Sequence, residues 1–301
     1  MADYKKKPDW FKIKLPTSTR FSKTKDIVKS SGVATVCEEA SCPNISECWT
    51  QGTATFMIMG DTCTRACRFC NVKTGIPKMP PDSKEPENLA EAIKEFGVEY
   101  VVITSVNRDE LPDGGSGHFA KCIRAIQEKC PSTLVEVLTP DFFANENQIR
   151  NVVEAKPNVY AHNIEVVKEL QREIRDPRAS YANSLETLRT VKRIDRKMPT
   201  KSSIMVGVGE TQEQVLQAMG DLRDAGVSFL TVGQYLRPTE NHYPVNEFIH
   251  PDVFKFYEEE GTKIGFDYVA SGPLVRSSYK AGEYYIKNML DGGNGKEEGF
   301  V

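Results

Sequence analysis

The sequence has no apolar run that approaches the length of a membrane span, for which about 20 consecutive apolar residues are needed. It has no excess of basic residues either, because 39 Lys and Arg stand against 42 Asp and Glu, for a formal net charge of -3. Nucleic-acid-binding domains usually carry a strongly basic face. The sequence also shows no secretory signal, and its first ten residues lack the Arg and Ser of transit peptides. We therefore expect a cytoplasmic protein that binds neither nucleic acid nor membrane.

Histidine is scarce, whereas cysteine is concentrated in one short stretch. The chain has four histidines and eight cysteines, and six of the cysteines form two triplets near the N-terminus. The N-terminal triplet has the spacing C-x4-C-x5-C and the second triplet the spacing C-x3-C-x2-C; they comprise Cys37, Cys42, Cys48 and Cys63, Cys67, Cys70. Each triplet has one ligand fewer than a closed zinc site or a fully cysteine-ligated four-iron cluster. An open coordination position of this kind favours catalysis.

Two other uses of clustered cysteines compete with this interpretation. Disulfide frameworks belong mainly to small secreted domains, and a chain of 301 residues buries enough surface to fold without them. Structural zinc is the stronger alternative, because cysteine-rich spacings of this length are common in zinc sites. A zinc-binding interaction protein without catalysis therefore stays open as a second class of function. Two incomplete triplets side by side favour iron–sulfur clusters.

After the second triplet, short β-rich runs alternate with amphipathic helical patterns. The predicted strands are 54–59, 100–105, 134–138, 159–163, 203–208 and 229–235. The predicted helices are 89–96, 119–129, 147–155, 166–174 with 184–194, and 212–225. Six β-α units in series imply a parallel sheet with right-handed crossovers. The predicted fold class is α/β, a partial (βα)6 TIM-like barrel, with a doubly wound open sheet as the alternative.

The ends of the chain are predicted to be extensions of this barrel. Residues 1–52 carry the N-terminal triplet, residues 53–265 form the barrel, and residues 266–301 form a C-terminal extension. Glycine and charge are frequent from Asp291 onward, which is typical of a flexible tail. Within the barrel, Gly97, Gly226 and Gly265 are expected at helix C-termini and Ser83 at a helix start.

Polar residues follow each predicted strand, where barrel enzymes build their active sites. These loops comprise residues 60–63, 104–110, 139–141, 162–165, 207–211 and 233–237. Any one of them is an ordinary hydrophilic loop when taken alone. Because the second triplet lies in the first loop, the six together predict a site at the carboxyl ends of the strands.

The second triplet, in the segment CTRACRFC that ends at Cys70, resembles the signature of the radical S-adenosylmethionine superfamily. The N-terminal triplet and the segment Arg276-Ser277-Ser278-Tyr279 are similar to those of one family within it, lipoyl synthase. The resemblance extends from about residue 30 to about residue 288. It implies a transferase of lipoate biosynthesis, a sulfurtransferase that inserts sulfur at C6 and C8 of a protein-bound octanoyl-lysine. The first alternative within enzymes is another radical S-adenosylmethionine enzyme with an auxiliary cluster.

The resemblance also implies two 4Fe-4S clusters and S-adenosylmethionine as cofactors. The second triplet would hold the cluster that cleaves S-adenosylmethionine, and the N-terminal triplet would hold an auxiliary cluster that supplies the sulfur. The extensions would thus hold the auxiliary cluster, with Ser278 as its fourth ligand, Ser277 as the alternative ligand, and Arg276 against the cluster or the substrate. Implied partners are an octanoylated lipoyl-carrier protein or domain, a low-potential electron donor such as ferredoxin or flavodoxin, and an iron–sulfur assembly or carrier protein.

Contacts to S-adenosylmethionine are predicted in the strand-end loops. Hydroxyl and amide side chains suit the methionine and ribose groups, and glycine permits close approach of the backbone to the adenosyl group. The residues predicted to bind the cofactor are Thr104, Ser105, Asn163, Glu165, Gly207 and Gly209. By contrast, Cys122 lies in a helical pattern and is predicted to be a core or incidental residue. His118, His242 and His250 show no ligand-like spacing among them and are predicted to be structural.

Overall fold

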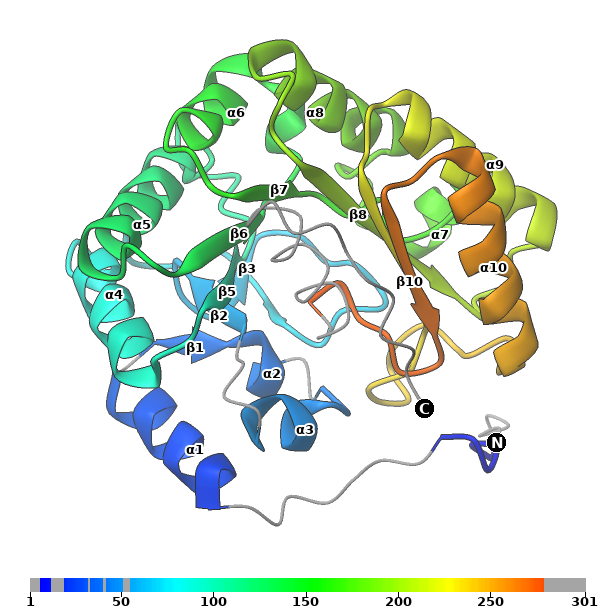
Figure 1. Ribbon diagram of the computed structural model, residues 1–301, viewed down its shortest axis with the longest axis horizontal. Coiled ribbons are helices and arrows are strands. Elements are labelled where there is room, and N and C mark those ends of the chain that lie inside the picture. The colour runs from blue at the N-terminus through cyan, green and yellow to red at the C-terminus, as the bar shows by residue number, and fades with distance from the viewer. Residues whose placement is uncertain (1–5, 12–18, 32, 40–41, 51–54, 279–301) are drawn as a thin grey trace.

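A computed structural model describes residues 6–11, 19–31, 33–39, 42–50 and 55–278. The predicted flexible tail, Tyr279 and the first residue of the predicted strand 54–59 lie outside these ranges. One curved sheet forms the centre of the molecule, and most helices cover its outer face (Figure 1). No helix in the described ranges is both long and apolar enough to span a bilayer.

The sheet has the strand order β1-β2-β5-β6-β7-β8-β9-β10. Seven of these strands run parallel, and β1 pairs with β2 in the antiparallel sense. The bounds are β1 Ala34–Thr35, β2 Thr55–Ile58, β5 Tyr100–Ser105, β6 Leu134–Leu138, β7 Val159–Ala161, β8 Thr200–Val206, β9 Phe229–Gln234 and β10 Tyr268–Gly272. No ladder joins the two edge strands within the described residues, so the sheet is a partial barrel. The predicted fold class is confirmed.

One parallel strand was missed by the sequence patterns. All six predicted strands are present, and β5 and β6 have the predicted bounds. β10 pairs in parallel with β9, with Tyr268 opposite Phe229, although it lies in the predicted C-terminal extension. The barrel therefore has seven parallel strands where six were predicted. The division at residues 52 and 265 stays a prediction.

Helices fill the connections between the strands, as expected for β-α units. The outer layer consists of α4 Glu85–Phe96, α5 Ser116–Lys129, α6 Glu146–Val153, α8 Tyr181–Ile194, α9 Gln212–Asp224 and α10 Pro251–Ile264. Shorter elements are α7 Gln171–Ile174, η1 Phe142–Ala144 and η2 Lys168–Leu170, together with a two-stranded sheet of β3 Thr62–Cys63 and β4 Lys73–Thr74. The N-terminal segment contributes α1 Thr19–Ser31, α2 Val36–Glu39 and α3 Ile45–Thr50.

The predicted helix boundaries are partly correct. Gly97 and Gly265 cap α4 and α10 with left-handed φ values of 63° and 99°, as predicted. Ser83, however, does not start α4: the N-cap residue is Lys84, and Pro86 lies in the first turn. Proline suits that position because it has no N–H to leave unpaired there.

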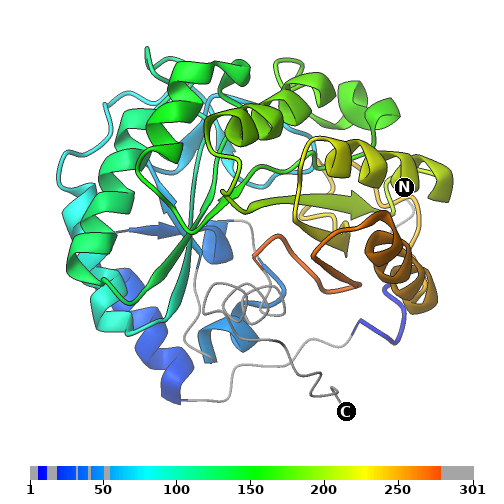
Figure 2. The same ribbon diagram turned by 45° about the horizontal axis from the view of Figure 1, so that its top comes forward.

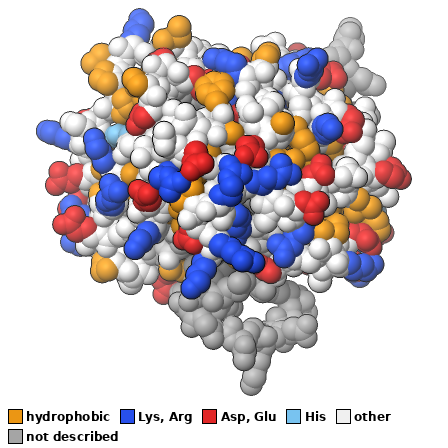
Figure 3. All heavy atoms as spheres, turned by 90° about the horizontal axis from the view of Figure 1, so that it is seen from above, with side chains coloured by type: hydrophobic (Ala, Val, Ile, Leu, Met, Phe, Trp, Pro, Cys, Tyr) orange, Lys and Arg blue, Asp and Glu red, His pale blue; other side chains and the backbone are white. Residues whose placement is uncertain are grey.

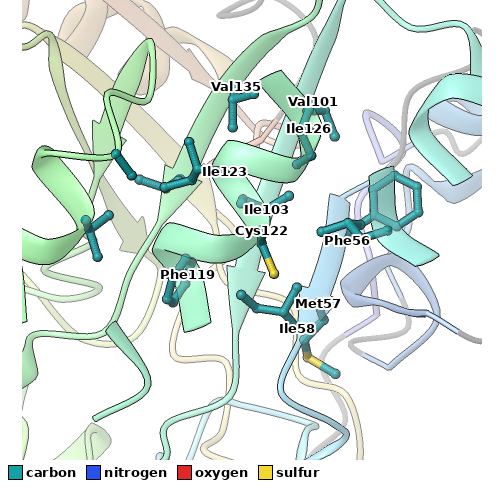
Figure 4. Close-up of a cluster of buried hydrophobic side chains, with 14 of the residues drawn as sticks. Phe56, Met57, Ile58, Val101, Ile103, Phe119, Cys122, Ile123, Ile126 and Val135 are labelled. Carbon is teal, nitrogen blue, oxygen red and sulfur yellow. The ribbon is translucent and has the colours of Figure 1, made fainter. Parts of the chain in front are cut away.

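Buried side chains divide into layers according to the alternation of each strand. Val101 and Ile103 of β5 pack against Phe119 and Cys122 of α5 (Figure 4). The prediction that Cys122 belongs to the core is confirmed, because its side chain is fully buried. Tyr100 and other residues on the opposite strand face pack inside the barrel. On the face shown in Figure 3, basic and acidic side chains are interspersed.

Candidate active site

The second cysteine triplet begins after a sharp turn at the end of β2. Met59 and Gly60 both have positive φ, of 67° and 91°. The N–H of Met59 donates to the carboxylate of Glu85, and its carbonyl accepts from Arg108 Nη1 at 2.9 Å. These bonds hold a left-handed conformation that costs a non-glycine residue roughly 1–2 kcal/mol. His118 Nε2 lies 2.6 Å from Glu85 Oε2, and the structural role of this histidine stays a prediction.

The cysteine loop, residues 63–70, is closed by the pairing of the strands on either side of it, β3 and β4. β3 and β4 pair in parallel, with Cys63 opposite Thr74, and the N–H of Gly75 donates to the carbonyl of Cys63 at 2.9 Å. At the other end of the triplet, His242 Nε2 lies 3.1 Å from the carbonyl oxygen of Cys70. The backbone of Cys63 is therefore tied to the returning strand β4, and that of Cys70 to the segment after β9.

Backbone N–H groups point at all three sulfurs, and the one directed at Cys70 belongs to Val72. Cys63 Sγ accepts from the N–H groups of Arg65 and Asn107, each at 3.4 Å. Cys67 Sγ accepts from the N–H of Asp176 at 3.3 Å. Hydrogen bonds donated to sulfur stabilise the thiolate, which is the form that binds metal.

Burial opposes that ionisation in the absence of a cation. It raises the pKa of the Cys67 thiol, and it raises the pKa of Cys70 to about 12. A bound iron cluster reverses this preference, because a coordinated thiol loses its proton. Three clustered sulfurs with donors already directed at them fit a cluster that keeps one iron open.

A buried ion-pair network joins the cysteine loop to the loops after β5 and β6. It is formed by Arg65, which lies between Cys63 and Cys67, and by Asp109 and Asp141. Arg65 donates to Asp109 through Nε and Nη2, at 2.9 and 3.1 Å. It donates to Asp141 through Nη1 and Nη2, at 3.0 and 2.8 Å. Burial raises the pKa of Asp141, but the hydrogen bonds and charge of Arg65 outweigh it and lower that pKa overall. The sequence did not reveal this network, although both aspartates lie in the predicted strand-end loops.

A second ion pair holds the middle of the loop. The Asp176 carboxylate accepts from the N–H of Ala66 at 2.8 Å and from Arg178 Nε at 2.8 Å. Hydrogen bonding from Arg178 lowers the pKa of Asp176, so this carboxylate is charged at neutral pH. Asp176 therefore contacts the loop twice, through its carboxylate and through the N–H that it directs at Cys67. This role also went unrecognised in the sequence.

Buried polar atoms without partners gather near the carboxyl ends of the strands. Ser105 Oγ, Asn107 Oδ1, Asn163 Oδ1 and Ser271 Oγ have no hydrogen-bond partner among the described residues. A buried unsatisfied polar atom costs roughly 1–3 kcal/mol. Four of the eight such atoms in the described ranges thus belong to the ends of strands or the loops after them, where they fit a polar ligand such as S-adenosylmethionine.

The two predicted ligand residues of β5 lie on different faces of the strand. Thr104 shares the inward face with Tyr100, and its hydroxyl donates to the carbonyl of Leu138 at 2.9 Å. Ser105 follows it and points to the other face, because strand side chains alternate. Their contact with the cofactor stays a prediction for both residues.

Asn163 and Glu165 lie just beyond the end of β7. Glu165 has a left-handed φ of 67°, a conformation that costs a non-glycine residue roughly 1–3 kcal/mol and is found mainly at functional sites. Burial raises the pKa of Glu165, while the charge of Arg175 and a hydrogen bond from Asn163 oppose the shift. Hydrogen bonds from Glu165 N–H to Ser203 and from Met205 to the Glu165 carbonyl lock the position.

The two predicted glycines differ in their surroundings. Gly207 has a φ of 89°, and a Cβ at this position would lie 2.0 Å from Gln234 Nε2 and 2.4 Å from the carbonyl of Glu247. Protein packing alone therefore requires glycine there. Gly209, with a φ of 114°, has only Asn246 near its Cβ position, at 3.9 Å. The predicted approach of the adenosyl group is sterically easier at Gly209.

The N-terminal triplet is spread over α2, the following turn and α3. The N–H of Cys42 donates to the carbonyl of Cys37 at 3.1 Å, and the N–H of Cys48 donates to that of Asn44 at 2.9 Å. Burial raises the pKa of Cys37 to about 11, against hydrogen bonding from the backbone of Thr55. As in the second triplet, buried thiols favour a bound cation.

The terminal motif packs against this triplet. Asn44 Nδ2 donates to the carbonyl of Leu274 at 2.7 Å, and Thr55 Oγ1 donates to Ser278 Oγ at 2.9 Å. Burial lowers the pKa of Arg276, and the charge of Cys42 opposes that shift, so the two side chains are electrostatic neighbours. Figures 1 and 2 show the segment after β10 turning back toward α2 and α3. The structure thus brings Ser278 and Arg276 to the N-terminal triplet.

A direct hydrogen bond connects the two triplets. Asn71, which follows Cys70, donates through Nδ2 to the carbonyl of Glu39, two residues after Cys37, at 2.9 Å. The two sets of sulfur ligands therefore lie on adjoining segments, as a site that uses both requires.

His162 was predicted only as part of a strand-end loop, and its environment makes it neutral. Its Nδ1 lies 2.8 Å from the carbonyl of Thr139, and its Nε2 lies 2.9 Å from Ser184 Oγ. Because a carbonyl can only accept, Nδ1 carries the proton and Nε2 accepts from Ser184. Burial and the charge of Arg175 lower the pKa of His162 to about 4.

This shift predicts a loss of stability in acid. In the unfolded chain this histidine takes up a proton near pH 6.5, whereas in the folded protein it does so only near pH 4. Its contribution to the free energy of unfolding is therefore fully present above pH 6.5 and is lost as the pH falls from 6.5 to 4. The parent should lose about 2 kcal/mol more of its free energy of unfolding between pH 7.5 and 5 than His162→Gln. Urea unfolding of the two anaerobic proteins measures this. The exposed-site control, His250→Gln, should keep the parental pH dependence; an unchanged dependence in His162→Gln would contradict the assignment.

Comparison with known proteins agrees with this geometry. The model of the radical SAM superfamily matches residues 57–242. A solved structure of the FeFe-hydrogenase maturase HydG from Carboxydothermus hydrogenoformans superposes with a TM-score of 0.55 at 13% identity, covering 89% of this chain and 78% of that one. The chain belongs to the radical S-adenosylmethionine superfamily, whose members use a 4Fe-4S cluster and S-adenosylmethionine.

Relatives with about half of their residues identical to this chain are lipoyl synthases. The chain is 53% identical to the apicoplast lipoyl synthase of Plasmodium falciparum (isolate 3D7) over 95% of its own length and 69% of the relative's. It is 53% identical to the lipoyl synthase of Anaeromyxobacter sp. (strain Fw109-5), over 95% of this chain and 97% of that one. The chain spans 65% of the apicoplast relatives from Plasmodium vivax and Plasmodium knowlesi. Within the superfamily, it belongs to the lipoyl synthase family.

Proposed function

We propose that this protein catalyses insertion of two sulfur atoms, at C6 and C8 of an octanoyl chain linked by an amide to a lysine of a carrier protein. The observation that carries the proposal is the bond between Asn71 and Glu39, which holds the two cysteine triplets on adjoining segments. A radical generator and a sulfur source must lie within reach of one acyl chain, and adjoining triplets meet that requirement. The family membership supports the same reaction.

The second triplet would hold the four-iron cluster, through Cys63, Cys67 and Cys70. With S-adenosylmethionine bound, this cluster supplies a 5′-deoxyadenosyl radical by one-electron cleavage of the sulfonium. The protein contributes orientation: Asp176 and Asn107 direct N–H groups at the sulfurs. The Arg65 network keeps the loop in place beneath them.

The cofactor would bind the polar groups at the carboxyl ends of the strands. Glu165, held in a strained conformation beside Arg175, offers a carboxylate to the methionine ammonium or a ribose hydroxyl. The unpaired oxygen of Asn163 offers an acceptor for the same groups. Ser105, which is on the other face of β5 from Thr104, would bond to the cofactor from the end of the strand. Thr104 would bond to the methionine part, while Gly207 and Gly209 would lie along the adenosyl group. Enclosure by the barrel would exclude water from the radical.

An auxiliary cluster, held by Cys37, Cys42, Cys48 and Ser278, would supply the sulfur atoms. A serine oxygen is a poor match for soft iron–sulfur chemistry, so this ligand should leave readily. Thr55 donates to Ser278 Oγ, and such a donor stabilises the negative charge that a ligating oxygen carries. That contact favours Ser278 over Ser277 as the ligand. Arg276 would position the terminal motif against Cys42.

The reaction requires partners beyond the chain. Its substrate is an octanoylated lipoyl-carrier protein or domain, and its electrons come from a low-potential donor such as ferredoxin or flavodoxin. An iron–sulfur assembly or carrier protein would restore the consumed cluster. We place this chemistry in the cytoplasm, where thiols stay reduced.

Anaerobic purification tests the proposal. The brown protein should contain about eight iron and about eight sulfide per chain, the content of two 4Fe-4S clusters. With S-adenosylmethionine, dithionite and an octanoylated carrier domain, mass spectrometry should detect the lipoyl product. A colourless protein with about two zinc ions would instead support a zinc-binding interaction protein. Cleavage of S-adenosylmethionine without any thiolated carrier would identify a different radical enzyme.

A further inference from the structure

Two large apolar side chains stand exposed on the segment after the second triplet. Ile76 and Met79 are 79% and 73% exposed, more than the other large hydrophobic residues of the described ranges. They lie three residues apart on the connection between β4 and α4. Apolar groups presented together on a surface are a common sign of a partner.

The segment is fixed, so the apolar pair is held outward by the fold. Arg108, itself buried, donates through Nη2 to the carbonyl of Met79 at 2.8 Å. The same guanidinium donates through Nη1 to the carbonyl of Met59, where the cysteine loop begins. One buried side chain thus anchors both the exposed segment and the start of the cysteine loop.

The segment also lies directly against a predicted cluster ligand. Thr74 is opposite Cys63 in the pair of β3 and β4, and Thr74 Oγ1 lies 3.3 Å from the carbonyl of Arg65. Gly75, whose N–H donates to the carbonyl of Cys63, immediately precedes Ile76. Ile76 is therefore one residue, and Met79 four residues, from a hydrogen bond to the segment that carries the second triplet.

Three lysines lie on the same segment as the pair. Lys73, Lys78 and Lys84 are exposed, and none of them forms an ion pair with another described residue. Asp82 is the one acidic residue between positions 71 and 84, and its carboxylate accepts from the backbone N–H of Lys84. The chain as a whole carries a net charge of -3, so this basic surface is a local feature. It is complementary to an acidic protein.

We propose that this docking patch, formed by Ile76, Met79, Lys73, Lys78 and Lys84, binds the electron donor of the enzyme. The donor is a small, acidic, low-potential iron–sulfur or flavin protein, which loses one electron as the cluster on the second triplet gains one. This inference rests on the proposed function. A small apolar centre with a charged rim suits a transient redox complex, which needs a fast encounter and rapid release.

The patch fits the electron donor better than the octanoylated carrier. An electron donor needs only to approach the cluster, and each contact described above leads to the second triplet. An acyl chain must instead reach both triplets, which meet at Asn71 and Glu39. None of the hydrogen bonds and ion pairs described above joins a residue of the patch to the N-terminal triplet, although Asn71, two residues before Lys73, bonds to Glu39.

The test compares two reductants on the intact holoenzyme. In Lys73→Glu/Lys78→Glu/Lys84→Glu, formation of 5′-deoxyadenosine with reduced [2Fe–2S] ferredoxin should fall at least about tenfold at low salt. The parental rate should fall as salt rises, and the variant should lose that dependence. With dithionite, a small anion that needs no docking surface, both proteins should have the same rate. The matched control, Lys121→Glu/Lys197→Glu/Lys255→Glu, carries the same charge change elsewhere and should behave as the parent.

Three results would contradict the proposal or redirect it. An unchanged ferredoxin rate in the patch variant would overturn the proposal, and a raised KM for the octanoylated carrier with dithionite would assign the patch to that partner instead. If the triple variant loses iron, Ile76→Ser/Met79→Ser provides the same comparison without charge reversal, and retention of its ferredoxin rate would equally overturn the proposal. Absence of cleavage by the parent with both reductants would refute the proposed function and not the docking site alone.

Discussion

Cys42→Ala should cleave S-adenosylmethionine at a rate close to the parental one and form no detectable thiolated product. Cys42 belongs to the N-terminal triplet, whereas the donors to the sulfurs of the second triplet come from Arg65, Asn107 and Asp176. Loss of one thiolate from the auxiliary site therefore leaves the radical-generating site complete. Iron content should fall from about eight to about four per chain, the content of one 4Fe-4S cluster.

The assay quantifies 5′-deoxyadenosine and the thiolated carrier in the same anaerobic reaction. Cys67→Ala should lose both products, because it disrupts the site where the radical forms. Cys122→Ala is the matched control, since this cysteine is buried in the core between β5 and α5. It should retain both activities. Parental amounts of thiolated carrier from Cys42→Ala would refute the division of labour between the two triplets.

The sequence predicted the parallel barrel because hydrophobic periodicity is a local property. β10 escaped detection because it ends in small or polar residues, Ala270, Ser271 and Gly272, and therefore lacks the apolar run of the other strands. Its place in the sheet depends on pairing with β9 across the whole of α10. The wrong start of α4 has a similar cause: Ser83 is a good capping residue, but the position of Pro86 determined the first turn.

The cysteines of the site were also predicted from the sequence, because each triplet lies within one short segment and its spacing is a local pattern. Arg65 was not, since its partners lie 44 and 76 positions away and become neighbours only when β5 and β6 are paired. Isolated aspartates in hydrophilic loops resemble solvated surface residues. The different faces of Thr104 and Ser105 could have been anticipated from strand alternation. The packing that requires glycine at position 207 depends on Gln234, which only the fold brings near.

Arg65→Met should be the most destabilising substitution at the site. The Arg65 and Asp141 side chains are 2% and 0% exposed, and the Asp109 side chain is 16% exposed. Methionine fills much of the space but leaves the Asp141 carboxylate without its cation, whereas Asp109 keeps Arg178 at 3.4 Å. Removing one partner of a buried ion pair costs about 3–5 kcal/mol, because the remaining charge stays desolvated. The cysteine loop should loosen as well, with loss of iron and of S-adenosylmethionine cleavage.

The pH dependence of this loss follows from Asp141. In the parent its pKa is lowered, so its contribution to stability is present above the unfolded value of 3.8 and disappears as the pH falls below it. In Arg65→Met the largest lowering influences on that pKa are gone, and burial is opposed only by His162 and the backbone N–H of Phe143. The pKa should therefore rise, so protonation relieves the variant as the medium becomes acidic. The difference in free energy of unfolding should therefore be largest near pH 7 and shrink toward pH 4, as measured by urea denaturation. Arg193→Met, which removes an exposed partner of Glu186, should cost less than about 1 kcal/mol. Equal stabilities of the Arg65 and Arg193 variants would contradict a supporting role for the network. Adding Asp141→Asn to Arg65→Met should restore part of the lost stability, because it removes the buried charge.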